Sequence, residues 1–215
     1  MTGDLFSANA SASASANAPL LRPLPGTPGL QVWPAVLGAS RANVLMDRLL
    51  ASLPWSQPEV TVYGRTGPVP RLQSWHGDPD ADYAYSGLPL PPRPWTPELD
   101  ALRRTVEAVT GHRYNSVLAN LYRNGEDTMG WHADDERELG PQPWIASYSL
   151  GATRDFTLRR KGQGRIEDRI ALAHDQLILM PPAMQRLWEH ALPRRARVSA
   201  PRLNLTFRLI RKTGR

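Results

Sequence analysis

The residues of this chain with the clearest chemical potential are His132 and Asp134, which stand two positions apart, and a further histidine, His190. An extended backbone points residues two apart toward the same side, so His132 and Asp134 can bind one metal ion together. His190 would be the third ligand. Two imidazoles and one carboxylate leave positions on the metal open, as in non-haem Fe(II) oxygenases. Zinc hydrolases use a similar ligand set, so these residues alone leave both chemistries open.

A second polar pattern lies near the C-terminus, where residues 202–209 alternate between polar and apolar types. The alternation predicts a strand with Arg202, Asn204, Thr206 and Arg208 on one face and apolar side chains on the other. On an edge strand, the polar face would simply lie in water. Two arginines beside an amide and a hydroxyl are more typical of an anion pocket. We therefore expect this face to bind the two ends of a small dicarboxylate.

Residues 115–122 also read as a strand, and Asn120 and Tyr122 share one of its faces. The amide and the phenol would complete the hydrogen-bond shell of the same acid. A half-exposed strand would give the same pattern, so the segment gains its meaning from its position before the two motifs above.

Taken in order, these patterns resemble the AlkB family of Fe(II)/2-oxoglutarate-dependent dioxygenases, which oxidatively repair alkylated nucleic-acid bases. The likeness is closest to the eukaryotic-type DNA repair branch and runs from about Val60 to Ile210. It includes the segments VYGRTGPVPRLQSWHGD, YAYSGLPLPPRPW, NSVLANLYRNGEDTMGWHADDERELG, IASYSLGATRDFTLRRK and APRLNLTFRLI. The resemblance implies a mainly β (α+β) fold, with a double-stranded β-helix (jelly-roll) core, N-terminal supporting helices and a nucleotide-recognition lid.

The resemblance also implies an activity and its cofactors. The chain would demethylate N-alkylated bases of the 1-methyladenine and 3-methylcytosine type in DNA, or in RNA, using Fe(II), O2 and 2-oxoglutarate and releasing formaldehyde, succinate and CO2. The catalytic, metal-binding residues would be His132, Asp134 and His190. The residues that bind 2-oxoglutarate would be Asn120, Tyr122, Arg202, Asn204, Thr206 and Arg208. Of these, Arg202 and Tyr122 would hold the distal carboxylate, and Arg208, Asn120 and Asn204 would lie nearer the keto-acid end.

The target atom of such a base is inaccessible in a stacked duplex, so the base must be flipped out or offered in a single strand. By resemblance, the lid would stack on the base through Tyr83, Tyr85 and Ser86, and Asp135 and Glu136 would contact its exocyclic amine. Tyr63 matches a hairpin finger that enters the duplex, where wedge residues are usually apolar. Phosphates would be contacted by Arg194, Arg195 and Arg197. A buried aromatic pair and solvated charged loops are the plainer interpretations of these residues.

Three other functions stay open from the sequence. A 2-oxoglutarate oxygenase acting on RNA or protein would keep the same iron and acid sites. A zinc hydrolase would leave the polar face of residues 202–208 unexplained. A catalytically silent nucleic-acid-binding module would need a broken site, yet every matched ligand position is intact.

Charge and composition favour a nucleic-acid partner and a single domain. The chain has 215 residues and a formal charge of +6, with a net charge of −4 over residues 1–150 and +10 over residues 151–215. A basic region of this kind favours a polyanion. Because only two residues are lysines, the arginine content can also reflect codon usage. The absence of cysteine excludes disulfides, thiolate ligands and a cysteine nucleophile.

The composition predicts a low-complexity, disordered tail over residues 1–26. The resemblance implies one dioxygenase domain over 27–215, with a lid at about 55–95 and a β-helix core at about 112–215. A helix is expected from Thr96, as cap, to Gly111, and a shorter one after Ser40. Strands are predicted at 115–122, 145–150, 155–159, 166–172, 176–180, 187–191 and 203–210, without helices between them. We find no secretory signal or membrane-spanning run, and we expect a cytoplasmic monomer that does not bind membranes.

Overall fold

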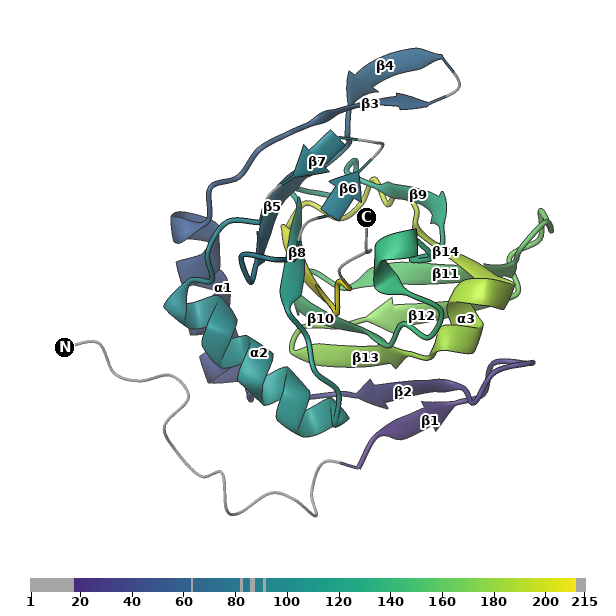
Figure 1. Cartoon of the computed structure of the whole chain (residues 1–215), viewed down its shortest axis with the longest axis horizontal. Helices are drawn as coiled ribbons and strands as arrows, with labels where there is room; N and C mark the ends of the chain where they lie inside the picture. The colour runs from purple at the N-terminus through teal and green to yellow at the C-terminus, as the bar shows by residue number, and fades with distance from the viewer. Residues whose placement is uncertain (1–17, 63, 82, 86–87, 91, 212–215) are drawn as a thin grey trace.

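The computed structural model describes residues 18–62, 64–81, 83–85, 88–90 and 92–211 of the chain. Within these residues, two antiparallel sheets face each other (Figure 1), which confirms the expected jelly-roll core. The larger sheet has the order β1 (Leu20–Arg22), β2 (Leu30–Trp33), β13 (Gln176–Met180), β10 (Ile145–Gly151), β15 (Arg202–Arg208), β8 (Ser116–Tyr122) and β5 (Leu72–Gly77). The smaller sheet has the order β12 (Asp168–Leu172), β11 (Arg154–Arg160), β14 (Trp188–Leu192) and β9 (Met129–His132).

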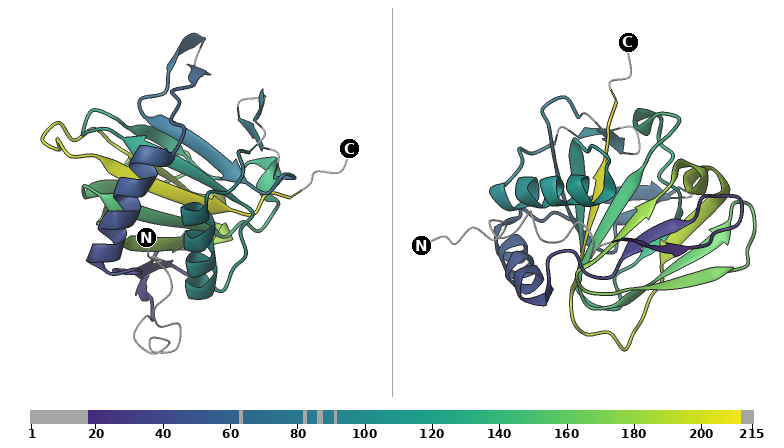
Figure 2. Two further views of the ribbon diagram at one scale, coloured as in Figure 1. Left: turned by 90° about the vertical axis from the view of Figure 1, so that its left-hand side faces the viewer. Right: turned by 90° about the horizontal axis from the view of Figure 1, so that it is seen from below.

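Two short hairpins stand over the end of the sheets where β9 lies (Figures 1 and 2). One consists of β3 (Glu59–Val62) and β4 (Arg65–Pro68), and the other of β6 (Tyr83–Tyr85) and β7 (Leu88–Leu90). Both belong to the segment that the sequence predicts as a lid.

Two helices, α1 (Ala39–Ser52) and α2 (Pro97–Thr110), cover the outer face of the larger sheet (Figure 2). Their fully buried leucines, such as Leu45 and Leu102, belong to one core cluster with Leu205 of β15. The predicted ends of α2 are confirmed, because the Thr96 side chain accepts a hydrogen bond from the Leu99 amide and Gly111 closes the helix in the left-handed conformation. Across the described residues, we find no helix with the length and apolar character that a membrane span requires.

The predicted cap of α1 is wrong. The helix begins at Ala39, before Ser40, and Gly38 precedes it without a side-chain cap. Asp175, a buried residue on the loop before β13, takes this role from outside the helix. Its carboxylate accepts hydrogen bonds from the amides of Leu37 and Gly38 at 2.9 and 2.7 Å. The capping group is distant in sequence, so no local pattern could reveal it.

Asp175 also accepts a hydrogen bond from the Tyr148 hydroxyl at 2.6 Å, and it adopts a left-handed φ of 62°. Burial and the neighbouring carboxylate together raise the pKa of the Tyr148 phenol. The buried Asp175 side chain therefore joins the start of α1 to strand β10.

Replacement of Asp175 with alanine should lower the free energy of unfolding by about 3 kcal/mol, because buried donors lose their acceptor and alanine is strained at positive φ. Asp175→Asn should cost less, since asparagine tolerates this conformation and keeps one oxygen. Urea unfolding would measure both, with Asp47→Ala on the exposed side of α1 as a control expected to change by less than about 0.5 kcal/mol. Equal stability of the wild type and Asp175→Ala would contradict this role.

Strand β15 lies inside the larger sheet, between β10 and β8, and all seven of its residues are buried. Leu203, Leu205 and Phe207 pack in the helix-side cluster. The polar residues of the strand therefore face the interior between the two sheets. A solvated edge strand, the alternative interpretation of this segment, is wrong.

The strands predicted from residue 115 onward all form, with ends within two residues of those expected. Several further elements were not predicted. Residues 129–132 form β9, residues 20–22 of the expected tail form β1, and a short helix, α3 (Pro182–Leu187), separates β13 from β14. These segments are too short for a periodic pattern. Strand β1 pairs with β2, and its Arg22 side chain also donates to the Asp168 carboxylate of β12 at 2.7 Å.

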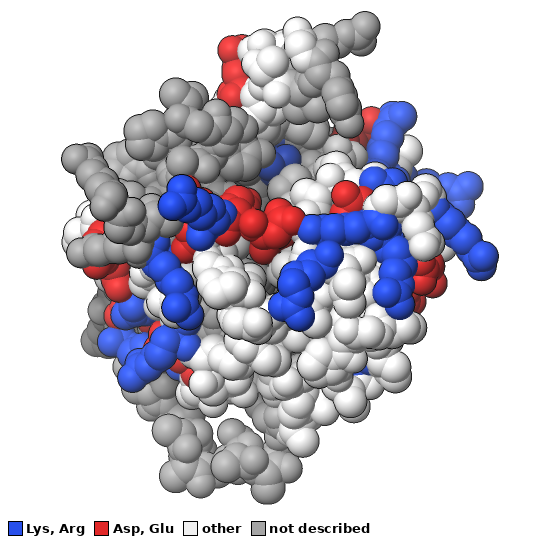
Figure 3. All heavy atoms as spheres, turned by 45° about the vertical axis from the view of Figure 1, so that its right-hand side comes forward, with Lys and Arg blue, Asp and Glu red and all other residues white. Residues whose placement is uncertain are grey.

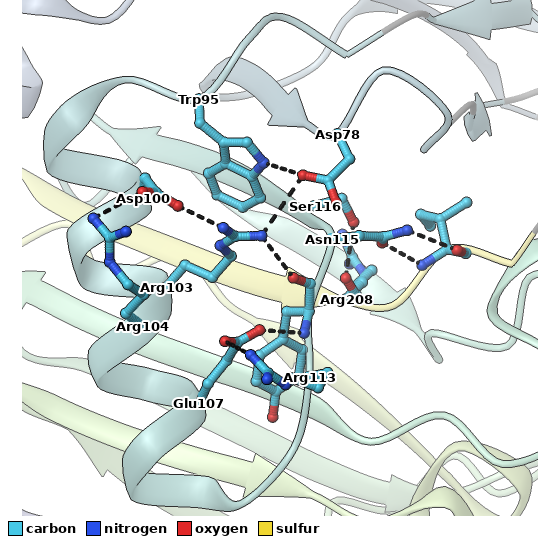
Figure 4. A network of polar contacts seen from close by, with 12 residues as sticks. Asp78, Trp95, Asp100, Arg103, Arg104, Glu107, Arg113, Asn115, Ser116 and Arg208 are labelled. Atoms are coloured by element: carbon cyan, nitrogen blue, oxygen red, sulfur yellow. Dashed lines mark hydrogen bonds and ion pairs between the residues drawn. The ribbon is translucent and has the colours of Figure 1, made fainter.

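A polar network fastens α2 to the strand ends that carry the candidate site (Figure 4). Arg103 of α2 lies 3.6 Å from the Asp78 carboxylate and donates to the Tyr114 carbonyl at 3.4 Å. Beside it, the Ser116 hydroxyl of β8 donates to the Arg208 carbonyl of β15 at 3.0 Å. The network thus helps to fix the backbone of Arg208, the last residue of β15.

Candidate metal centre and anion pocket

The structure brings His132, Asp134 and His190 together, as the sequence predicts. His132 on β9 and His190 on β14 are directly paired in the smaller sheet, and Asp134 follows two residues after the first histidine. One ligand atom from each side chain lies within 4.8 Å of the others. Among the described residues, this is the only such cluster of histidine and carboxylate side chains.

Hydrogen bonds set the orientation of two of these ligands. The His132 Nδ1 atom lies 2.9 Å from the Gly130 carbonyl, so it acts as a donor there and leaves Nε2 available to a metal. The Asp134 amide donates to the Gln185 side chain of α3 at 2.9 Å. The unpredicted helix α3 therefore supports the carboxylate between the two histidines.

The charges around the cluster favour metal binding. Burial opposes ionisation of the Asp134 carboxyl, but Arg208 and the two histidines hold its pKa well below its usual range. For His190, burial lowers the pKa to about 3, and the neighbouring His132 acts in the same direction. The site thus offers an ionised carboxylate and a neutral imidazole, which are the protonation states that a metal needs. This donor set fits Fe(II) with open coordination positions.

A cavity extends from the cluster between the two sheets. It is lined by all the residues that the sequence predicts for metal and acid binding. In full, the lining residues are Asn120, Tyr122, Met129, His132, Asp134, Ser147, Phe156, Met180, His190, Ala191, Leu192, Arg202, Asn204, Thr206 and Arg208.

Arg202 is a buried cation whose hydrogen-bond partners are neutral. It donates to the Ser149 hydroxyl and the Asn204 side-chain oxygen, both at 2.9 Å, and its guanidinium lies 5.5 Å from the centre of the Tyr122 ring. Its Nε atom is buried without a partner, and among the described residues no carboxylate pairs with it. Burial lowers its pKa to about 10. A buried cation in this state fits an anionic ligand, such as one carboxylate of a dicarboxylic acid.

The two arginines of β15 have different surroundings. Arg208 forms an ion pair with Asp134, so it lies directly beside the candidate metal ligands, whereas Arg202 lies at the other end of the strand. This arrangement agrees with the expected division, in which Arg202 is distal and Arg208 is nearer the metal. The assignment of particular ligand atoms to each arginine stays a prediction.

The residues expected to contact a base or a phosphate are placed less completely. Tyr83 and Tyr85 lie on strand β6, so their backbone positions agree with the expected lid. Tyr63 and Ser86 lie outside the described residues. Asp135 is exposed and lies 2.5 Å from the Lys161 ammonium, and Glu136 is half-buried at the start of a short 3₁₀ turn, η1 (Arg137–Leu139).

The three arginines expected to contact phosphates differ from one another. Arg194 pairs with Glu126 at 2.5 Å, and Arg195 pairs with Asp155. Arg197 is exposed. Pairing with carboxylates reduces the positive charge that Arg194 and Arg195 offer to a polyanion, which leaves Arg197 as the strongest candidate of the three.

Several residues of the site were not singled out from the sequence. Ser149 contacts Arg202, and the Ser147 hydroxyl donates to Asn204 at 2.9 Å. Both serines share one face of β10. The alternation of residues 145–150 could therefore have predicted that the two hydroxyls face the same side as each other. The ring of Phe156 lies 4.9 Å from that of His190, and as a single apolar residue it gives no such signal.

Comparison with known proteins places these features in context. A family model described as the 2OG-Fe(II) oxygenase superfamily matches residues 29–208. The chain is 47% identical over 162 residues to a protein of Mus musculus named DNA oxidative demethylase ALKBH2, with 72% of this chain and 68% of that protein covered. It is 38% identical over 188 residues to a Homo sapiens protein named alpha-ketoglutarate-dependent dioxygenase alkB homolog 3, with 83% and 65% covered. The chain therefore spans about two thirds of the length of these relatives.

Solved structures share the fold at low identity. A structure titled "The structure of OsALKBH1" matches with a TM-score of 0.59 and 18% identity, covering 88% of this chain and all of that chain. An oxidoreductase of the 2OG-Fe(II) oxygenase family from Burkholderia pseudomallei matches with a TM-score of 0.53 and 16% identity, covering 83% and 84%. Together with the geometry above, the matches provide a basis for assigning a family.

Proposed function

This chain belongs to the 2OG-Fe(II) oxygenase superfamily, and we propose its function from that premise. The proposed activity is oxidative demethylation of N-alkylated bases in DNA, with Fe(II) as cofactor and with 2-oxoglutarate and O2 as co-substrates. The relatives named DNA oxidative demethylase support the choice of DNA.

The observation that carries the proposal is the presence of two unlike sites in one cavity. The cluster of His132, Asp134 and His190 can bind a metal, and Arg202 offers a buried positive charge without a carboxylate partner among the described residues. A zinc hydrolase would have no use for this second site. A metal-dependent oxygenase that also binds a dicarboxylate needs both.

Bound Fe(II), with 2-oxoglutarate and O2, would supply the oxidation that removes an N-alkyl group as formaldehyde and leaves succinate and CO2. The residues of the chain bind and orient the reactants. His132, Asp134 and His190 hold the metal, and Arg202 binds a carboxylate of 2-oxoglutarate against the Tyr122 ring. The apolar side chains of Phe156 and Met180 exclude water from one side of the cavity.

The substrate would reach this cavity as an extruded base, since its alkyl group is inaccessible within a duplex. The position of β6–β7 over the end of the sheets that carries β9 supports a stacking role for Tyr83 and Tyr85. In Figure 3, Lys and Arg side chains border acidic ones across one face of the molecule. Exposed cations such as Arg197 would meet the phosphates.

The test is aerobic turnover of the full chain with Fe(II) and 2-oxoglutarate on oligonucleotides that contain 1-methyladenine or 3-methylcytosine. We expect conversion to the unmodified base, detected by mass, with matching amounts of succinate and formaldehyde. Single-stranded DNA, duplex DNA and RNA of one sequence are compared. Turnover of 2-oxoglutarate without repair of any of these oligonucleotides would reject nucleic-acid demethylation, and repair of RNA alone would reject DNA as the substrate.

A further inference from the structure

Arg71 lies on the segment that leads into β5 and contacts a residue that lines the cavity. The residue is 3% exposed, and its Nε atom donates a hydrogen bond to the Asn120 Oδ1 atom at 2.9 Å. Its Nη1 atom lies 3.5 Å from the Thr128 carbonyl, and the Gln73 Nε2 group donates to the same Asn120 Oδ1 atom at 3.0 Å. Arg71 thus contacts Asn120, which lines the cavity, without lining the cavity itself.

The chemistry of Arg71 decides how the Asn120 amide is oriented. A guanidinium has only N–H donors, so the amide atom that faces it must be the oxygen. The two atoms of an amide point in different directions, so the Nδ2 group is directed away from Arg71. Among the described residues this Nδ2 group makes no hydrogen bond, and Asn120 borders the cavity. The amide therefore offers a donor, and not an acceptor, to a ligand.

We propose that Arg71 is a positioning residue that holds the Asn120 amide with its NH2 group toward the cavity, so that this wall selects the acceptor oxygens of 2-oxoglutarate. The inference rests on the proposed function, because it takes 2-oxoglutarate as the ligand. Gln73 alone does not fix this orientation, because its amide can present either a donor or an acceptor to Asn120. Without Arg71, both amides are able to turn, and Asn120 then presents its carbonyl, which repels a carboxylate or keto oxygen. The loss of Arg71 would thus act on the ligand through Asn120.

A purely structural role for Arg71 makes a different prediction. Through Thr128, the residue connects β5 to the segment that leads into β9, and this contact does not involve Asn120. A structural effect on the site would therefore persist when Asn120 is absent. A double-mutant cycle separates the two roles, because residues that act through one another are not additive.

The experiment measures binding of 2-oxoglutarate by calorimetry to the full chain loaded with Mn(II), without nucleic acid. We expect Arg71→Met and Asn120→Ala each to weaken binding about tenfold, as one hydrogen bond to a charged group would, and the double variant to show about the same loss. Arg71→Lys, which can still donate to Asn120, should retain most of the affinity. Arg41→Met, an exposed arginine on α1, should bind as the wild type does.

Two results would overturn this inference and leave the proposed function standing. One is wild-type affinity for 2-oxoglutarate in Arg71→Met. The other is a double variant that binds 2-oxoglutarate about a hundredfold more weakly, which is the product of the two single effects. If thermal unfolding shows that Arg71→Met does not fold, Arg71→Gln takes its place in the cycle, because it keeps a polar side chain of similar reach. Failure of the wild-type chain to bind 2-oxoglutarate would instead overturn the proposed function, and this inference with it.

Discussion

Replacement of His132 with alanine is expected to abolish demethylation and to weaken metal binding by more than about a hundredfold, since removing only a supporting partner of a ligand costs about 10- to 100-fold. His132 supplies one of only three protein ligands in the cluster found among the described residues, and its Nδ1 hydrogen bond to Gly130 leaves Nε2 available to a metal. The residue is half-buried at the end of β9, so the fold should survive its loss.

Three measurements separate loss of the metal from loss of the fold. Mn(II) binding by calorimetry reports on the cluster directly, base repair by mass reports on activity, and thermal unfolding reports on the fold. His112→Ala, a half-buried histidine that stacks on Trp144 away from the cavity, is the matched control and should keep both metal binding and activity. A His132→Ala protein that repairs methylated DNA at the wild-type rate would refute the assigned ligand set.

The sequence predicts the site well where polar and apolar residues alternate along a strand. The period of two in β15 places Arg202 and Arg208 on one face whatever surrounds the strand, and the same holds for Asn120 and Tyr122 of β8. The sequence could not decide whether that face lies in water. Pairing of β15 with β10 on one side and β8 on the other decides this, because it buries the strand.

The features that the sequence did not reveal depend on contacts between distant segments. Asp175 caps α1 from a loop more than a hundred residues away, and Gln185 of α3 supports Asp134 across the interior. Arg71 donates to Asn120 from the segment before a neighbouring strand. In each case an ordinary polar residue gains its role from a partner that only the tertiary fold supplies, so local patterns carry no signal for it.

The family resemblance contributed what residue patterns could not, namely the co-substrate and the class of substrate. The matched family model and the relatives confirm the family. The contacts to nucleic acid stay predictions, since Tyr63 and Ser86 lie outside the described residues and Arg194 and Arg195 already pair with carboxylates.

Arg202→Met is expected to weaken binding of 2-oxoglutarate by about 30- to 1000-fold, which corresponds to about 2–4 kcal/mol for loss of a buried, charge-assisted contact. The same change should not destabilise the protein when 2-oxoglutarate is absent. Burial lowers the pKa of Arg202 to about 10, because the interior disfavours its charge and no carboxylate pairs with it among the described residues. Methionine removes this cost and keeps most of the apolar volume.

Arg154 provides a matched control for this prediction, because it is also buried and also lies near the Tyr122 ring, at 5.9 Å. Unlike Arg202, it donates to the backbone carbonyls of Asn124, Asp127 and Pro193, at 3.0, 2.9 and 2.7 Å. Arg154→Met should therefore lower the free energy of unfolding by about 2–4 kcal/mol through the loss of these contacts. Urea unfolding and calorimetric titration of both variants give the comparison. If Arg202→Met lost as much stability as Arg154→Met, or kept the wild-type affinity for 2-oxoglutarate, Arg202 would be a structural residue and not the anion site of the cavity.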